Sequence, residues 1–155
     1  MSPALGRAIT AIGWWCLLAS LGAEPRPNPI LTPQQVIHTV VEVLQHSNSP
    51  IPNAGIFTVY QFASPKTRGS IGPYGRFLRL VKSPTFSTLV TGNVTDYGPL
   101  SIAGDLAQQA VSFRVKHGEL VWFQFILSRQ TSEQTQGRCS GCWMVDEVTP
   151  MDFKQ

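Results

Sequence analysis

The last third of the chain constrains the fold more than any other stretch. Leu120–Ser128 and Trp143–Thr149 are two apolar runs of strand length, rich in aromatic and β-branched residues. A polar loop at 131–137 separates them, and Cys139 and Cys142 stand just before the second run. Because apolar strands need a covered face, we expect the upstream segments to pack over the sheet that these strands form.

The first helix is predicted by its start signal. Thr32 can cap a helix, Pro33 suits the first helical position, and Gln35 stands where a capping-box side chain returns. Apolar residues then recur at helical spacing as far as about His46. His38 lies beside this apolar stripe, so it is either a residue at the edge of the core or a site residue.

Further helices are predicted before the strands begin. Residues 54–63 are read as helix, although their β-branched and aromatic residues would also suit a strand. Ser64 followed by proline is typical of another helix start. A helix over 73–82 would place three apolar side chains inward: Phe77, Leu80 and Val81.

The apolar spacing then changes to two residues. Short strands are predicted at 86–90 and 98–103, and a longer one at 107–116 leads into the turn signal His117-Gly118. Helices followed by an antiparallel meander predict an α+β fold, in which N-terminal helices pack on a curved antiparallel sheet that encloses a conical cavity. The strand aromatics alternate between two faces, so a homodimer through the sheet is expected.

The two ends of the chain differ in composition from its centre. Residues 1–22 read as a signal peptide or a membrane anchor, because Arg7 precedes an apolar stretch over 8–21. A proline-rich linker is expected at 23–31, the domain at 32–149 and a tail at 150–155. The protein is therefore expected to be exported, or tethered to a membrane by residues 8–21 alone.

The formal charge of +3 is too small to favour a nucleic-acid partner, which we do not expect. Its distribution is uneven, because no Asp or Glu occurs between Glu42 and Asp96. Two interpretations stay open: the basic segment folds against the acidic one, or it forms a face for an anionic ligand or lipid headgroups. The basic residues of this segment are Lys66, Arg68, Arg76, Arg79 and Lys82.

Cys139 and Cys142 have the spacing of a redox pair, but they precede a strand and no βαβ pattern surrounds them. A local structural disulfide is the favoured interpretation, with a reversible redox switch or unpaired thiols as alternatives. No second cysteine pair or histidine pair is present to complete a zinc site, so neither a metal nor another cofactor is expected.

Several short motifs, in order, resemble the DUF4864 family and its neighbours in the NTF2-like (cystatin-like α+β) superfamily. The matching segments are Gln61-Phe62-Ala63-Ser64-Pro65 with Arg68, Gly72-Pro73, Arg76-Phe77, Ala103-Gly104-Asp105, Leu127-Ser128-Arg129-Gln130, and Gly141-Cys142-Trp143-Met144 with Val148. The resemblance covers about residues 32–149 and implies the NTF2-like cone but no assigned activity. Thr67 departs from the asparagine that the family pattern has there.

No catalytic constellation can be recognised, so no catalytic residue is assigned. Candidate proton-transfer groups occur without a pattern; they are Tyr60, Tyr74, His38, Asp96 and Asp146. The expected function is non-catalytic binding of a small anionic or apolar ligand, or of a partner protein; the alternatives are an enzyme acting in the cone pocket and a redox-responsive module. Alternatively, Arg129 does not line a pocket but pairs with Asp146 or Glu147 across the sheet. The pocket candidates are Tyr60, Ser64, Arg68, Arg76, Arg129 and Gln130.

Overall fold

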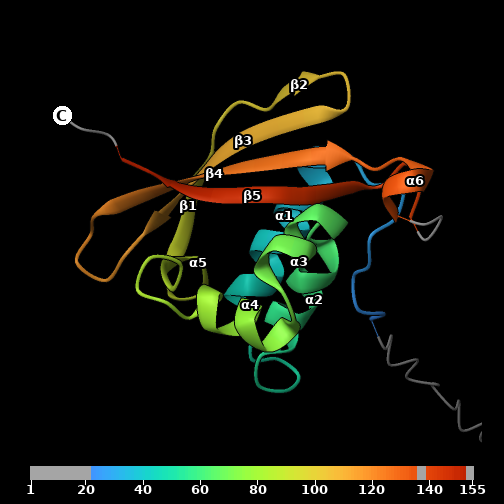
Figure 1. Ribbon diagram of the computed structural model, residues 1–155. Helices are drawn as coiled ribbons and strands as arrows, with labels where there is room; N and C mark the ends of the chain where they lie inside the picture. The colour runs from blue at the N-terminus through green and yellow to red at the C-terminus, as the bar shows by residue number, and fades with distance from the viewer. Residues whose placement is uncertain (1–21, 136–138, 153–155) are drawn as a thin grey trace, which may run out of the picture.

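A twisted antiparallel sheet lies over a layer of helices (Figure 1). The computed structural model describes residues 22–135 and 139–152. Residues 1–21, on which the prediction of a signal peptide or anchor rests, lie outside this part of the chain. Within the described residues no helix is both long and apolar enough to cross a bilayer.

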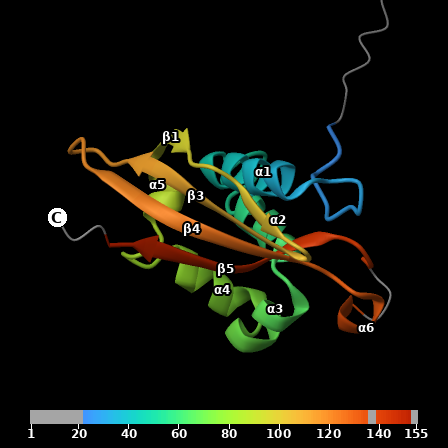
Figure 2. The same cartoon turned by 90° about the horizontal axis from the view of Figure 1, so that it is seen from above.

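The helices alternate with short turns and cover one face of the sheet, as the view from above shows (Figure 2). A further short helix lies in the loop between the last two strands. The helices are α1 (Pro33–Gln45), α2 (Ala54–Phe62), α3 (Pro65–Ile71), α4 (Tyr74–Val81), α5 (Thr88–Thr91) and α6 (Ser132–Thr135).

The sheet of the described residues has five strands, in the order β1-β3-β4-β5, with β2 pairing to the other end of β3. All these pairings are antiparallel, and β4 runs along the full length of both β3 and β5. The α+β class is therefore confirmed. The strands are β1 (Asn93–Tyr97), β2 (Ser101–Ala103), β3 (Leu106–Arg114), β4 (Leu120–Arg129) and β5 (Trp143–Met151).

The predicted helix starts are confirmed by their hydrogen bonds. The Gln35 amide donates to Thr32 Oγ1 at 3.2 Å, and Gln35 Oε1 accepts from the Thr32 amide at 2.9 Å, which completes the capping box. Ser64 Oγ accepts from the Thr67 amide at 3.2 Å at the start of α3. The helix over 54–63 is confirmed as α2.

The region between α4 and β3 differs from the predictions in three places. Residues 86–90 are not a strand: they lead into α5, which Gln45 Nε2 holds against α1 by donating to the Leu89 carbonyl at 2.8 Å. Residues 93–97, for which no strand was predicted, form β1, and only 101–103 of the strand expected at 98–103 pair with β3. Tertiary pairing decides these short segments, whose local preferences are weak.

Smaller differences concern chain ends and one side chain. Leu80, expected inward, is 38% exposed because it lies at the edge of the buried stripe of α4. The polar loop expected at 131–137 contains α6, and its residues 136–138 lie outside the described chain. β5 continues to Met151, so the expected tail begins as strand.

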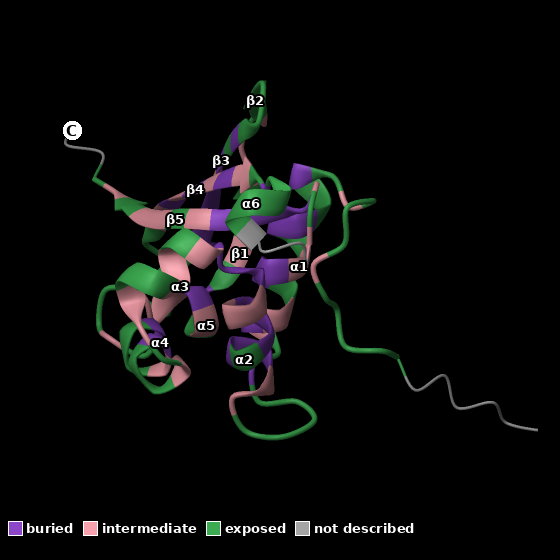
Figure 3. Cartoon of the chain, turned by 45° about the vertical axis from the view of Figure 1, so that its right-hand side comes forward, coloured by how far each residue is buried: buried purple, intermediate pink, exposed green. Residues whose placement is uncertain are grey.

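The core lies between α1, α2 and the inner face of the sheet, where Figure 3 shows the buried residues gathered. Phe113, Phe123 and Phe125 have no exposed surface and alternate with outward-facing residues. On the outer face Trp122 and Ile126 are half-buried and Leu106 is 55% exposed. This outer face is the surface through which a homodimer was predicted.

Candidate functional site

A cavity of about 260 Å³ lies between the helices and the β4–β5 side of the sheet. Its walls are almost entirely apolar, since α1, α2, α4, α5 and the sheet all turn buried side chains toward it. The polar lining residues belong to α3 and β5. The lining residues are Val40, Leu44, Val59, Ala63, Thr67, Ser70, Ile71, Phe77, Leu80, Val81, Phe86, Leu89, Phe125, Val145, Asp146, Glu147 and Val148.

Hydrogen bonds attach the start of α3 to β5 beside the cavity. The Ser64 amide donates to the Val145 carbonyl at 2.8 Å, next to a parallel bridge between Ala63 and Val145. Thr67 Oγ1 donates to the Asp146 carbonyl at 2.7 Å. These bonds cover part of the edge of β5 and hold one wall of the cavity in place.

Exposed lining residues mark where the cavity opens to solvent. Ser70, Leu80 and Glu147 are exposed, and they come from α3, α4 and β5 respectively. A β-bulge lies at this rim, because Leu127 pairs with Val145 while Ile126 pairs with Glu147. The intervening residue of β5 is Asp146, which has no partner in the register.

The hydroxyl groups at the rim already act as donors within the protein. Thr67 Oγ1 donates to the strand, and Ser70 Oγ donates to the Thr67 carbonyl at 3.0 Å. Among the described residues, no arginine, lysine or histidine lines the cavity. The cavity can therefore hold an apolar molecule away from water. The charged residues of its lining are acidic, Asp146 and Glu147, and both belong to β5.

None of the six predicted pocket residues lines this cavity, and they do not meet at one place. Three of them, Tyr60, Arg68 and Arg76, gather around Gly72 at the turn between α3 and α4. Ser64 is the buried N-cap of α3.

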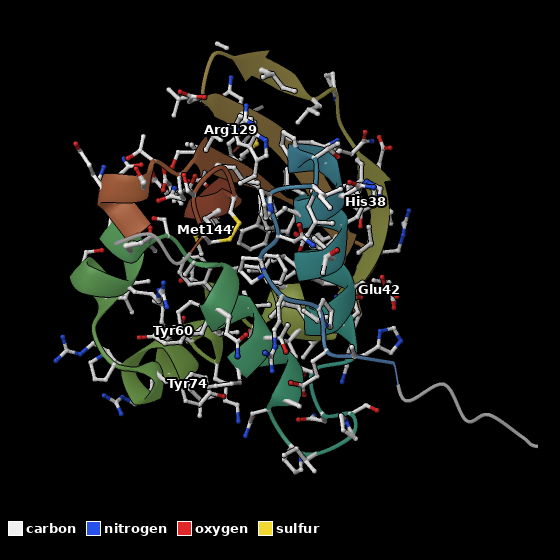
Figure 4. The ribbon with its side chains drawn as sticks, turned by 90° about the vertical axis from the view of Figure 1, so that its right-hand side faces the viewer. His38, Glu42, Tyr60, Tyr74, Arg129 and Met144 are labelled. Atoms are coloured by element: carbon white, nitrogen blue, oxygen red, sulfur yellow. A yellow bond between two sulfur atoms is a disulfide. The ribbon has the colours of Figure 1, made fainter. Side chains whose placement is uncertain are left out.

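The other two predicted residues lie at the far end of β4. Figure 4 shows Arg129 at the sheet and Tyr60 in the helical layer. Arg129 Nε donates to the Gly141 carbonyl at 3.4 Å, and within the described residues it forms no ion pair with Asp146 or Glu147. Gln130 is buried and donates to Ser128 Oγ at 2.8 Å.

Cys139 and Cys142 are joined by a disulfide, with their α-carbons 5.5 Å apart. Cys142 is completely buried, and its carbonyl accepts from the Gln130 amide at 2.8 Å. The turn that closes the bridge needs a left-handed residue, which Gly141 supplies with φ of 81°. Burial of Cys142 restricts the access of a thiol reagent to this sulfur.

A second, polar groove follows the outer side of α1 against β1. Its residues include His38, Glu42, Gln45 and Tyr97, and Figure 4 shows His38 and Glu42 along this side of the helix. Burial, and secondarily the charge of Glu42, raise the pKa of the Tyr97 hydroxyl above its ordinary value. Among the described residues no group of three or more His, Cys, Asp or Glu side chains could hold a metal ion.

The proton-transfer candidates are not assembled around the cavity. Asp146 lines the rim, but His38, Tyr60, Tyr74 and Asp96 do not line it. The lining residues that the sequence did not single out, such as Phe86 and Phe125, look like ordinary core residues in the sequence. No sequence signal distinguishes a side chain that lines a cavity from one that fills the core.

In comparisons with known proteins, no family model, no curated protein and no solved structure matches the chain.

Proposed function

We propose that the protein binds a small, mainly apolar molecule in the cavity between its helices and the β4–β5 side of the sheet. The observation that carries this proposal is the cavity itself, which has about 260 Å³ of space and walls of buried aliphatic and aromatic side chains. An apolar cavity of about 150 Å³ holds a benzene molecule, so by proportion this one holds about ten carbon atoms. The role is binding rather than catalysis.

We also propose that the fold is the NTF2-like cone of the DUF4864 family. What supports this proposal is the order of the motifs, together with helices that pack on an antiparallel sheet beside a cavity. Export of the protein is proposed on the disulfide, because such bonds persist in oxidising compartments. Mass spectrometry of the protein secreted by its own cells tests removal of the signal peptide, which a mature chain that keeps residues 1–22 would contradict.

Ligand binding is tested with two variants that occupy the cavity in different ways. Ala63→Leu adds volume to a buried wall residue, whereas Ser70→Trp adds bulk at the exposed opening and leaves the core unchanged. Ala103→Leu, in the exposed strand β2, is the matched control. Isothermal titration with a series of small alcohols and benzene derivatives measures the affinity.

We expect saturable binding of one molecule per chain, which both cavity variants weaken at least about tenfold and the control leaves unchanged. Filling an apolar cavity also removes unfavourable empty space, so Ala63→Leu is expected to raise the free energy of unfolding if the side chain fits. Binding that survives both Ala63→Leu and Ser70→Trp would overturn the proposal, because it would place the ligand elsewhere.

A further inference from the structure

The turn between α3 and α4 brings three polar side chains to one glycine. Gly72 has φ of 94°, and its carbonyl accepts a hydrogen bond from the Tyr60 hydroxyl at 3.0 Å. The guanidinium of Arg76 lies beside the same glycine, since a Cβ at Gly72 would lie 3.4 Å from Arg76 Nη1. Arg68 lies over the Tyr60 ring, with its Cζ 6.0 Å from the ring centroid.

Arg68 carries a buried donor without an acceptor. Its Nε has almost no exposed surface and makes no hydrogen bond. A buried donor left unpaired is unfavourable, so few occur in folded proteins without a reason. The Nη groups of Arg68, unlike Nε, are not buried, and no hydrogen bond to a described residue fixes them, so they can bind an acceptor that the chain itself does not supply.

The segment around Arg68 contains no negatively charged side chain that could serve as its acceptor. No Asp or Glu occurs in residues 43–95, which include all of α2, α3, α4 and α5. Within the described part of the chain neither Arg68 nor Arg76 has an ion-pair partner. The two guanidinium groups thus remain uncompensated at a single turn.

The start of α4 adds backbone donors beside the arginines. Its N-cap is Pro73, which forms no side-chain cap, and its first turn contains no acidic residue. The first N–H groups of a helix have no partner within the helix and favour an anion. Tyr74 and Gly75 carry these groups, directly after Gly72 and before Arg76.

We propose that the Gly72 cluster, defined as Tyr60, Arg68, Gly72 and Arg76, binds a phosphate group. Two guanidinium forks from different helices can contact several oxygens of a tetrahedral, doubly charged anion at once. The Tyr60 hydroxyl donates to the chain, so the ring acts as a support that positions Arg68. This site is separate from the apolar cavity, because none of its residues lines that cavity.

The test titrates the full chain with inorganic phosphate at constant ionic strength and follows backbone amide signals by NMR. We expect saturable shifts at Gly72, Tyr74 and Gly75 that chloride does not produce. Arg68→Ala is expected to weaken binding about tenfold or more, because a charge-assisted hydrogen-bonding group is lost. Arg68→Lys keeps the charge but loses the fork, so it should also weaken binding.

Arg79→Ala is the matched control, because Arg79 is exposed and lies in the last turn of α4, away from the end of the helix that follows Gly72. We expect it to change the affinity by less than about twofold, as for a screened surface charge. Amide spectra of each variant without phosphate establish that it is folded. Equal losses for Arg68→Ala and Arg79→Ala, or shifts that do not saturate, would show diffuse attraction and overturn the site.

A vesicle experiment identifies the source of the phosphate. Sedimentation with phosphatidylglycerol vesicles, against phosphatidylcholine vesicles, is compared for the original chain, Arg68→Ala and Arg79→Ala. Binding to the anionic vesicles that is lost in Arg68→Ala identifies a lipid headgroup, whereas phosphate binding without vesicle binding identifies a soluble phosphorylated compound. Ala63→Leu should leave both results unchanged, so failure of the apolar-ligand proposal and failure of this site are distinguishable.

Discussion

The ring of Tyr97 stacks on the imidazole of His38, with the ring centroids 3.9 Å apart and the planes 19° from parallel. The contact joins the outer side of α1 to the end of β1, an edge strand of the described sheet. His38 is exposed and lines the polar groove beside α1, so it lies outside the core rather than at its edge.

The raised pKa of Tyr97 predicts a loss of stability at alkaline pH. Above pH 10.0, the ordinary tyrosine value, the unfolded chain releases the phenolic proton while folded Tyr97 retains it. The unfolded state then holds fewer protons, so the free energy of unfolding falls as pH rises through this window. Tyr74, whose pKa burial also raises, contributes in the same direction.

Ultraviolet absorbance of tyrosinate and urea unfolding at increasing pH measure this effect. Tyr97→Phe should flatten the alkaline decline in part, and Glu42→Gln should lower the pKa of Tyr97 because it removes the nearby negative charge. Glu133→Gln, an exposed acid in α6, serves as the control. An unchanged tyrosinate titration in Glu42→Gln would contradict the assignment.

The disulfide is expected to stabilise the fold modestly. Because Cys139 and Cys142 close a short loop with a separation of three residues, loop-closure entropy predicts a loss of about 2 kcal/mol on reduction. Urea unfolding with and without a reducing agent measures this difference. Cys139→Ala should lose the same amount and become insensitive to the reducing agent. Equal stability of the oxidised and reduced chains would argue for a regulatory bond instead.

The Ser64 cap is expected to matter more than the Thr32 cap. Both side chains cap a helix, but Ser64 is buried and its Oγ is 2.9 Å from Thr67 Oγ1, which in turn binds the Asp146 carbonyl. Ser64→Ala should lower the free energy of unfolding by about 2 kcal/mol, against about 1 kcal/mol for Thr32→Ala. Similar losses in urea unfolding would show that the connection to β5 contributes little.

Two glycine-to-alanine substitutions should change the free energy of unfolding in opposite directions. A Cβ at Gly55 would collide with the Val43 carbonyl oxygen and lie 2.7 Å from Ser47 Cα, so Gly55→Ala should destabilise the protein by about 3 kcal/mol through overpacking between α1 and α2. Gly69, inside α3, has open space at this position, and Gly69→Ala should stabilise it by about 0.5–1 kcal/mol. Thermal unfolding of both variants checks the pair; a tolerated alanine at position 55 would refute the close approach.

Local chemistry made some elements predictable from the sequence. Thr32, Pro33 and Gln35 satisfy the first amides of α1 without help from the rest of the fold, and the two-residue alternation in β3 and β4 suffices to separate their core face from their outer face. The pair His117-Gly118 likewise predicted a turn, because glycine adopts the left-handed conformation easily. In the structure Gly118 has that conformation, with φ of 87°.

The candidate site depended on contacts that the sequence does not display. Arg68 and Arg76 were singled out as charged pocket residues, but the turn at Gly72 places them around Tyr60, while Arg129 ends at the opposite side of the sheet. A side chain's type indicates what it can bind, whereas its neighbours depend on how helices and strands pack.

The sequence by itself determined the helix starts, the strand alternation and the unbalanced positive charge, because these depend on neighbouring residues and on composition. Only the tertiary structure decided that 93–97 would pair as a strand, that 88–91 would be helical and that a cavity would remain beside Phe125. The physical reason is that short segments have weak local preferences, and that empty space is a property of packing among many side chains.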